Sequence, residues 1–170
     1  MATLSGIQNN VVPAFDLIKT LSDQEPGVVL DITGQLCQHK QQTDKHGSRG
    51  DIWLALYETG SLNMNVAVKT LRMHGSTAPQ RHIQRLAREL GKWKRLKHPN
   101  VLPLLGICHH GPYDFALVSE WMEAGHVRAY IETNPQILRS VLVRDVAEGL
   151  AYMHSLSMVH GDLRAVRFPM

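Results

Sequence analysis

The sequence has few of the residues that define disulfide-rich, zinc-binding or membrane-spanning proteins. Only two of its 170 residues are cysteines, Cys37 and Cys108, which give neither a disulfide framework nor the ligand spacing of a metal site. Apolar runs such as 101–108 are far shorter than the roughly 20 residues that span a bilayer. The N-terminus lacks a charged region followed by an apolar run. We therefore expect reduced thiols, no metal site built from cysteine, no membrane contact and a location in the cytosol or the nucleus.

An excess of charge of one sign is also absent. The formal net charge is only +3, and 44% of the residues are hydrophobic, which is ordinary for a globular protein whose length suits one compact domain. A net charge this small does not call for a nucleic-acid partner. The basic residues of the predicted helix 79–97 keep nucleic-acid binding as a third and weaker interpretation.

Alternation of apolar side chains predicts four strands in the first two thirds of the chain. The predicted strands cover residues 52–57, 66–69, 101–108 and 115–119, with hairpin or turn sequences at 58–65 and 111–112. The residues expected to form their common core are Ile52, Val66, Val68, Leu90, Leu102 and Leu117. Strands with one inserted helix, followed by helices, indicate an α+β fold and not an alternating parallel one.

Helical spacing predicts two long helices. In the segment 79–97, apolar residues recur every three or four positions, at Ile83, Leu86, Leu90 and Trp93. The segment 135–156 has a longer apolar stripe, formed by Leu138, Val141, Leu142, Val146, Leu150 and Met153. We expect this stripe to be uncovered in a chain of this length, as a partner site or an aggregation-prone surface.

The first 30 residues are weakly patterned. Ala14, Ile18 and Leu21 indicate a short amphipathic helix that ends before Pro26. The pattern fits a linker and an adaptor helix equally well.

Several residues have chemical potential, but each also has a simpler interpretation. Gly47 and Gly50 lie in a polar loop that could approach phosphates closely, although a plain hairpin turn explains them too. Lys69 ends an apolar strand and could place its ammonium on phosphate oxygens, or it could simply face water. Glu89 could pair with Lys69, or it could be one more charge on a solvated helix.

The segment 159–164 reads Val-His-Gly-Asp-Leu-Arg and follows the second long helix. Asp162 in such a loop could orient and deprotonate an attacking hydroxyl. The alternative is a turn residue that caps its own backbone.

Taken in order, these features resemble the signature set of protein kinases. The set runs from the glycine loop and Val-Ala-Val-Lys through a helix glutamate and His-Pro-Asn to His-Gly-Asp-Leu. More narrowly, Trp93–Gly106 and Leu117–Gly125 are very similar to tyrosine-kinase-like kinases, which are abundant in mushroom-forming fungi. Residues Asp31–Gln35 resemble the strand that precedes the domain in this group. The resemblance extends from Asp31 to Ala165.

The resemblance implies a protein-kinase-like α+β fold. Its N-lobe would be a five-stranded antiparallel sheet with helix C, and its partial C-lobe would contain helices D and E. We accordingly divide the chain into an N-terminal segment 1–30, an N-lobe with hinge 31–123, and the start of a C-lobe 124–170. The implied function is transfer of the ATP γ-phosphate to protein hydroxyls, with ATP and Mg²⁺ as cofactors and a protein substrate or protein partner.

The resemblance also implies an adenine site. Ile52 and Ala67 would line it, and Ser119 would be the gatekeeper beside the hinge. Glu120 and Met122 would offer backbone hydrogen bonds to the adenine ring.

The resemblance assigns the remaining residues to the phosphates and to catalysis. Gly47 and Gly50 would be the second and third glycines of the phosphate-covering loop, and Lys69 would hold the α- and β-phosphates with Glu89 as its ion-pair partner. Asp162 would be the catalytic base, and Arg164 would lie near the transferred phosphate.

The sequence departs from the family pattern at four places. Lys45 replaces the first glycine of the loop, and Gly161 replaces the usual arginine of the catalytic loop. Arg167 stands where the magnesium-binding asparagine should be, and the chain ends at Met170 without an Asp-Phe-Gly segment. We therefore expect this chain to be inactive as it stands, with a pseudokinase-type binding or scaffold module as the alternative. The choice between Ser/Thr and Tyr substrates and the oligomeric state stay open.

Overall fold

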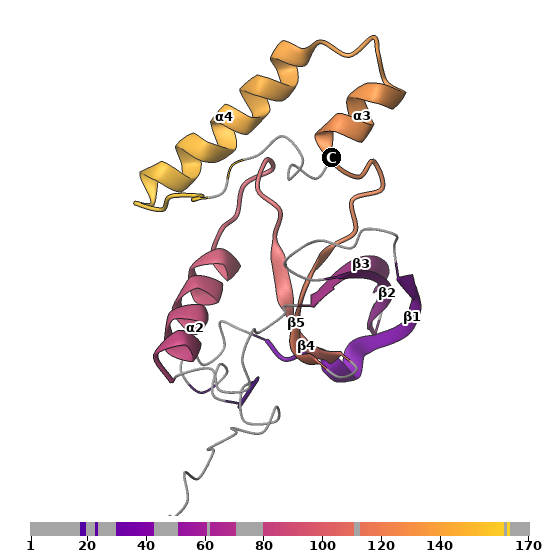
Figure 1. The fold of residues 1–170 in the computed structure, drawn as a ribbon, viewed down its shortest axis with the longest axis vertical. Helices are drawn as coiled ribbons and strands as arrows, with labels where there is room; N and C mark the ends of the chain where they lie inside the picture. Colours follow the sequence, from indigo (N-terminus) through magenta and orange to yellow (C-terminus); the bar gives the residue numbers. More distant parts are fainter. Residues whose placement is uncertain are drawn as a thin grey trace, which may run out of the picture.

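The computed structural model describes residues 18–19, 23, 30–42, 51–60, 62–70, 80–110, 113–161 and 163. The elements in chain order are η1 (Thr33–Gln35), β1 (Leu36–Gln42), β2 (Ile52–Thr59), β3 (Leu62–Thr70), α2 (Gln80–Lys94), β4 (Leu104–His110), β5 (Tyr113–Glu120), α3 (Val127–Thr133) and α4 (Arg139–Ser155). Figure 1 shows the sheet and α2 in one part of the molecule and α3 with α4 in the other. None of the described helices is both long and apolar enough to cross a membrane.

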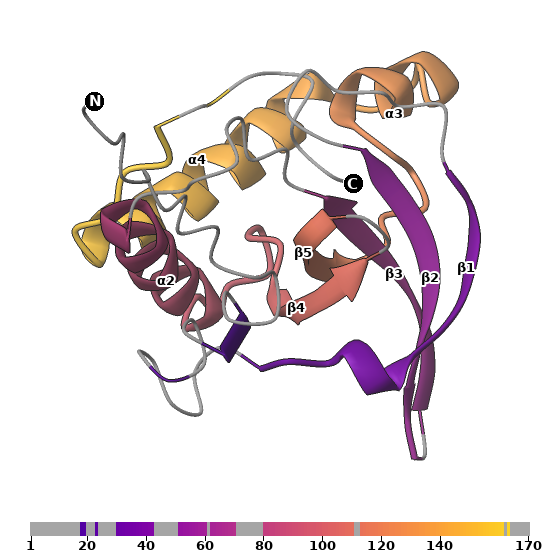
Figure 2. The ribbon, with the colours of Figure 1, turned by 60° about the horizontal axis from the view of Figure 1, so that its bottom comes forward.

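The five strands form one antiparallel sheet in the order β1-β2-β3-β5-β4. Figure 2 shows that the sheet curls, with β1 to β3 bending around on the side away from α2. Strong twist is expected because each strand is itself twisted and the rotations accumulate from strand to strand. The predicted five-stranded antiparallel α+β architecture is therefore confirmed.

The prediction of a strand over 31–35 is wrong. Asp31 forms only an isolated bridge to Ile107, and Thr33–Gln35 form a 3₁₀ turn before β1 begins at Leu36. The Asp31 carboxylate accepts hydrogen bonds from the Thr33 backbone N–H at 3.0 Å and from its hydroxyl at 2.6 Å. Such a local side-chain bond competes with strand pairing and bends the chain.

Apolar clusters cover both faces of the β3–β5–β4 part of the sheet. One cluster joins α2 to the sheet and consists of Ile18, Ala87, Leu90, Leu104, Ile107 and Leu117. The other lies on the opposite face and consists of Ile32, Ala55, Val66, Val68, Cys108, Ala116 and Val118. Burial, together with the nearby Asp31 carboxylate, raises the pKa of the Cys108 thiol to about 12. Both cysteines are free thiols.

Four of the six predicted core residues are buried, and two are not. Val66, Val68, Leu90 and Leu117 are at most 8% exposed. Ile52 and Leu102 are only half-buried, so their assignment to the core is wrong. Ile52 begins β2 on the face that carries Lys69, and Leu102 precedes β4, so neither lies between two packed layers.

The C-terminal end of α2 is fastened to the start of β4. The Trp93 indole N–H donates to the Leu102 carbonyl at 2.8 Å, and the Lys94 ammonium donates to the Leu105 carbonyl. Burial lowers the pKa of Lys94, but its aliphatic stem can cover apolar surface while its charge reaches a carbonyl. These two contacts hold the C-terminal end of α2 against the start of β4.

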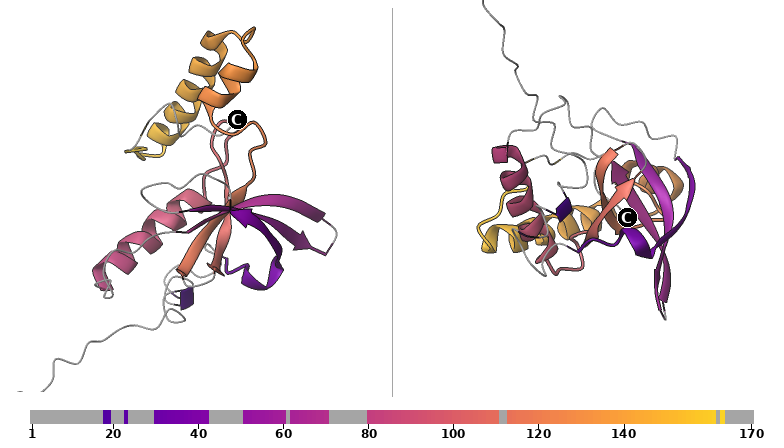
Figure 3. Two further views of the ribbon diagram at one scale, coloured as in Figure 1. Left: turned by 45° about the vertical axis from the view of Figure 1, so that its right-hand side comes forward. Right: turned by 90° about the horizontal axis from the view of Figure 1, so that it is seen from below.

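The helix α4 docks on the loop that follows α2. The Lys97 backbone N–H donates to the Tyr152 hydroxyl oxygen at 2.9 Å, and the Tyr152 ring stacks on His98 with centroids 4.9 Å apart. The Asn100 side-chain amide donates to the Glu148 carboxylate at 3.2 Å. Figure 3 (left) shows that the sheet layer and the α3–α4 layer meet at this loop and at the chain leaving β5.

The predicted apolar stripe of α4 is only partly uncovered. Leu142 is 6% exposed, whereas Leu138 at the helix start is 68% exposed. Val141, Val146, Leu150 and Met153 are half-buried. The expectation of an uncovered stripe therefore holds for Leu138 and is wrong for Leu142.

Gly149 offers a test of the α4 dock. A Cβ at this position would lie 2.7 Å from the Asn100 carbonyl oxygen. Alanine is the better helix former by about 1 kcal/mol, but overpacking against backbone costs about 1–3 kcal/mol. We expect Gly149→Ala to lower the midpoint of thermal unfolding by about 2–4 °C per kcal/mol of net loss. The control is Gly34→Ala, where no atom lies within 4 Å of the added Cβ. A rise in the midpoint for Gly149→Ala would contradict the close approach.

Candidate functional site

Lys69 lies near the end of the central strand β3. In the strand register it stands opposite Ile52 of β2 and opposite Leu117 of β5. Residues directly opposite each other in antiparallel strands share a face. Because Leu117 packs with Ala87 and Leu90 of α2, Lys69 lies on the sheet face against which α2 docks.

Five residues on this face form what we call the Lys69 face. They occupy two rungs of the ladder that are separated by the rung of Val68, and they are Ile52, Leu54, Ala67, Lys69 and Ser119. All five are half-buried. On the opposite face of the same strands, Val66, Val68 and Val118 are fully buried. The sheet thus has one closed face and one partly open apolar face that carries an ammonium and a hydroxyl.

Sequence analysis assigned four of these five residues and missed Leu54. Leu54 stands opposite Ala67, two positions after Ile52. The period-two alternation of strands would have placed it beside Ile52, so the signal was present in the sequence.

A pair of residues fastens the start of β2 to the end of β3. The Asp51 backbone N–H donates to the Thr70 hydroxyl at 3.0 Å, and this hydroxyl donates to the Asp51 carbonyl at 3.1 Å. The Thr70 backbone N–H donates to the same carbonyl at 2.9 Å. Asp51 and Thr70 are 4% and 0% exposed. Asp51 directly precedes Ile52 and Thr70 directly follows Lys69. This clasp therefore fixes the backbone next to both of these residues of the Lys69 face.

The chain leaves the sheet at the predicted hinge. Glu120 is the last residue of β5 and stands opposite Val66, and the next backbone N–H, of Trp121, donates to the Asn65 carbonyl at 3.1 Å. The Gly125 N–H then donates to the Met122 carbonyl at 3.0 Å, with Gly125 at φ +73°. A positive φ is readily adopted by glycine. Ser119 thus lies on the Lys69 face, and Glu120 and Met122 follow it where the chain leaves the sheet.

Glu89 projects from α2 toward solvent. Its carboxylate accepts a hydrogen bond from the Arg85 guanidinium at 2.9 Å, and the two side chains are 58% and 76% exposed. Exposed pairs at this helical spacing contribute only about 0.3–0.5 kcal/mol. The predicted ion pair between Glu89 and Lys69 stays a prediction, and the Arg85 contact is weak enough to exchange for it.

The phosphate-loop and catalytic-loop predictions lie outside the described residues. This holds for Gly47 and Gly50 and for Asp162 and Arg164. Gly161 is described and has φ +72°, a conformation in which a side chain would be strained.

The family resemblance implies Mg²⁺ as a cofactor of this chain. Among the described residues, no group of three or more histidine, cysteine or carboxylate side chains could hold a metal ion. Magnesium is usually bound by one or two carboxylates together with substrate phosphates, so the magnesium site of this chain stays a prediction.

A shallow pocket lies behind the hinge. Its lining residues are Leu96, Lys97, His98, Pro99, Val101, Pro103 and Glu120. Side chains alternate between the faces of a strand, so the Glu120 side chain points away from the face that carries Ser119. This pocket is therefore distinct from the Lys69 face.

Comparison with known proteins identifies the family. The family model for protein tyrosine and serine/threonine kinases matches residues 39–167. The match covers most of the chain, and the chain therefore belongs to the protein tyrosine and serine/threonine kinase family.

Individual relatives include both kinds of kinase. The chain is 37% identical over 123 residues to the discoidin domain-containing receptor tyrosine kinase B of Caenorhabditis elegans, covering 70% of this chain and 14% of the relative. It is 26% identical over 126 residues to the serine/threonine/tyrosine-protein kinase HT1 of Arabidopsis thaliana, covering 70% and 31%. It is 28% identical over 124 residues to the human tyrosine-protein kinase ABL2, covering 70% and 10%. The chain thus spans less than a third of the length of these relatives.

The clasp between Asp51 and Thr70 provides a test of the site framework. Thr70→Val keeps the shape but leaves the buried Asp51 N–H without its acceptor, which costs about 1–3 kcal/mol. Thr70→Ser keeps the hydroxyl and removes one methyl group, at about 0.8 kcal/mol. We expect the valine variant to have the lower free energy of unfolding in a urea titration. Equal stability of the two variants would show that the clasp does not hold β2 to β3.

Proposed function

We propose that this chain forms the nucleotide-binding part of a protein kinase of the tyrosine-kinase-like type. It binds ATP on the Lys69 face, and its kinase reaction transfers the γ-phosphate to a protein hydroxyl. The observation that carries the proposal is the contrast between the two faces of β2, β3 and β5. On one face Val66, Val68 and Val118 are fully buried, whereas the Lys69 face is a half-open apolar surface with a lysine at one end and the hinge at the other.

The arrangement fits the shape and polarity of ATP. A flat adenine ring can lie on Ile52, Leu54 and Ala67, because apolar surfaces with a few polar groups at the rim bind such ligands. Ser119 borders the surface next to Ala67, and the backbone of the hinge residues Glu120 and Met122 offers hydrogen bonds to the adenine ring. Lys69 is two residues beyond Ala67 on the same face of β3, where its ammonium attracts the phosphates.

Catalysis in this proposal depends on positioning and on charge. Phosphoryl transfer needs little covalent help from the protein and gains most from orientation and electrostatic stabilisation. Lys69 holds the phosphates, Glu89 pairs with Lys69, and Asp162 accepts the proton of the substrate hydroxyl. Arg164 stabilises charge on the transferred phosphate, and Gly47 and Gly50 provide backbone N–H groups above it. Bound magnesium would neutralise phosphate charge.

The substrate proposed is the hydroxyl of a serine, threonine or tyrosine in a protein, and the proposed location is the cytosol or the nucleus. Similarity to a receptor tyrosine kinase at 37% identity and to a serine/threonine/tyrosine-protein kinase at 26% identity supports no choice among these hydroxyls. The transferred group and the donor are the same in each case.

A second candidate function is a pseudokinase-type module that binds a nucleotide or a partner without catalysis. Arg167 favours it, because a cation five residues after Asp162 would repel the metal that an asparagine would bind. Phosphate transfer to a protein by the purified native protein would support the first candidate, and nucleotide binding without transfer would support the second.

Lys69→Met tests the proposed site directly. The substitution keeps the apolar stem and removes the charge, and hydrogen bonds to charged groups contribute about 1.5–3 kcal/mol. We expect the Kd for ATP in isothermal titration to rise at least about tenfold, whereas the Kd for adenosine should stay within about twofold because adenosine lacks phosphates.

The matched control is Lys92→Met on the exposed surface of α2, which should change neither Kd. An unchanged ATP affinity in Lys69→Met would refute the phosphate assignment. An equal loss for ATP and adenosine would show that the substitution damages the fold.

A further inference from the structure

The helix α3, which follows the hinge, begins with a histidine cap. His126 has extended backbone, at φ −100° and ψ 158°, and its carbonyl accepts the first helical hydrogen bond, from the Tyr130 N–H at 3.0 Å. Its ring Nδ1 accepts a hydrogen bond from the Ala129 N–H at 3.1 Å. Serine, threonine, asparagine and aspartate are the usual side chains in this role. Histidine differs from them because its charge changes between about pH 5 and 8.

The cap requires a neutral ring. Nδ1 accepts a hydrogen bond when the ring proton is on Nε2, whereas both ring nitrogens are donors in the protonated form. A proton on Nδ1 of His126 would set two donors against each other, because the Ala129 N–H already points at this atom. The N-terminal end of a helix also carries a partial positive charge. Hydrogen bonding and charge therefore act together, so the first turn is closed at neutral pH and opens as the pH falls.

No carboxylate of the described residues is paired with His126. The first turn of α3, all of which the structure describes, contains Arg128 and no acidic residue, and Arg128 is bonded to Glu132 at 3.1 Å. In the hinge, the Glu123 carboxylate accepts a hydrogen bond from the Trp121 indole N–H at 3.3 Å. The other charged or titratable groups nearby in the chain are Glu120 in the hinge, Arg139, Arg144, Asp145, Glu148 and His154 on α4, and His160 after it. A proton on His126 thus gains no ion-pair partner in this part of the chain.

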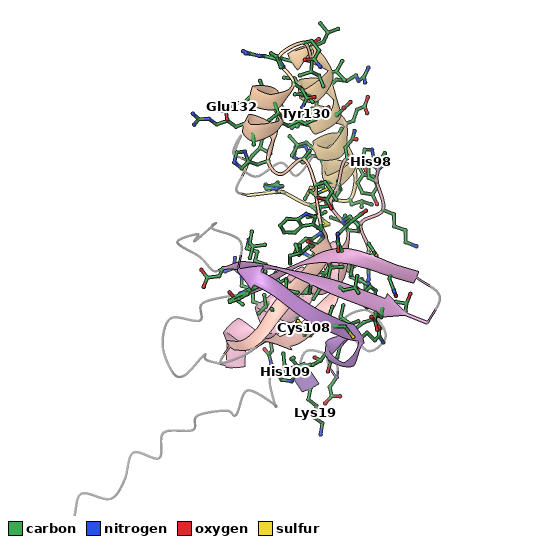
Figure 4. The ribbon with its side chains drawn as sticks, turned by 90° about the vertical axis from the view of Figure 1, so that its right-hand side faces the viewer. Lys19, His98, Cys108, His109, Tyr130 and Glu132 are labelled. Carbon is green, nitrogen blue, oxygen red and sulfur yellow. The ribbon has the colours of Figure 1, made fainter. Side chains whose placement is uncertain are left out.

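A second histidine accepts a backbone N–H in the loop that docks on α4, but its surroundings differ. The His98 Nδ1 accepts from the Asn100 N–H at 3.1 Å, and Figure 4 shows His98 on the side of the sheet where α3 and α4 lie. Its ring stacks on that of Tyr152, and the face of an aromatic ring attracts a cation. The Glu148 carboxylate is bonded to the side chain of Asn100. A proton is therefore better tolerated at His98 than at His126.

We propose that His126 is a pH-sensitive cap of α3: its neutral ring closes the first turn of the helix, and its protonated ring opens that turn. The cap lies directly after the hinge, where the Gly125 N–H donates to the Met122 carbonyl at 3.0 Å. Opening of the first turn therefore loosens the C-terminal end of the hinge. The sheet and α4 keep their contacts over the same range of pH.

The cap has a consequence for nucleotide binding because Met122 is one of the two hinge residues proposed to bond the adenine ring. A loosened hinge pays more ordering entropy when the ligand binds, so the affinity for adenine compounds falls in acid. This consequence rests on the proposed function, whereas the opening of α3 does not.

Amide exchange of single residues by NMR, in the full chain without nucleotide, tests the proposal. Protection factors, which correct for the effect of pH on exchange itself, are compared at about pH 7.5 and about pH 5.5, on either side of the range in which histidine changes charge. Protection of the Ala129 amide should fall at least about threefold in the acid sample, the loss expected when a capping side chain stops accepting. Protection in β3 and α4 should stay within about twofold.

Two substitutions of the same residue are the controls. His126→Asn keeps a good cap that does not titrate in this range, so protection of Ala129 should be equal at the two pH values. His126→Ala removes the cap, so protection should be low at both. No fall in the unsubstituted chain, or the same fall in His126→Asn, overturns the proposal. An equal fall in every element also overturns it, because acid would then unfold the chain as a whole.

The ring nitrogens and adenosine binding complete the experiment. The ¹⁵N chemical shifts of the His126 ring at neutral pH should show a proton on Nε2 and none on Nδ1, and a proton on Nδ1 at neutral pH overturns the proposal. The Kd for adenosine in isothermal titration should rise at least about threefold in the acid sample of the unsubstituted chain and stay within about twofold in His126→Asn. The exchange and ring readouts need no nucleotide, so failure of the cap and failure of the proposed ATP site are distinguishable.

Discussion

Burial of the apolar face of α2 against β4 and β5 is the constraint on which the rest of this structure depends. It covers part of the side of the sheet that carries Lys69, through Leu90, Ile107 and Leu117, and burial of apolar surface is the main favourable term in folding. Because Leu117 stands opposite Lys69, the same contact sets where Lys69 lies relative to α2. The loop that follows α2 contacts α4 through Tyr152.

The functional surface results from a sheet that is closed on one face and open on part of the other. Val66 and Val68 are buried on one face of β3 and hold the strand in place. Ala67 and Lys69 alternate with them on the other face, so they are held in position and stay half-exposed. Rigid support for a half-exposed strand is what a binding site needs, since the position of its groups is then fixed before the ligand arrives. The Asp51–Thr70 clasp adds the same support at the end of β3.

The sequence predicted local structure well and long-range contacts poorly. Alternation located β2 and β3, and helical spacing located α2 and α4, because these signals depend on neighbouring residues only. The strand predicted over 31–35 failed because the Asp31 side chain bends the backbone locally. Burial of Ile18 beneath α2 and docking of Tyr152 on His98 join segments that are far apart in the chain, and a single sequence has no pattern that reveals such pairs. The kinase motifs indicated the family because several separate motifs, on different strands, helices and loops, occur in the order that is typical of kinases.

Mapping the ATP footprint by hydrogen exchange on the full chain tests the central claim most directly. The account predicts that ATP slows amide exchange in β2 near residues 52–55, in β3 near 67–70 and in the hinge at 119–122, because these segments border the Lys69 face. Protection confined to the loop 96–103, which lines the pocket behind the hinge, would contradict the account and place the ligand on the wrong side of the sheet.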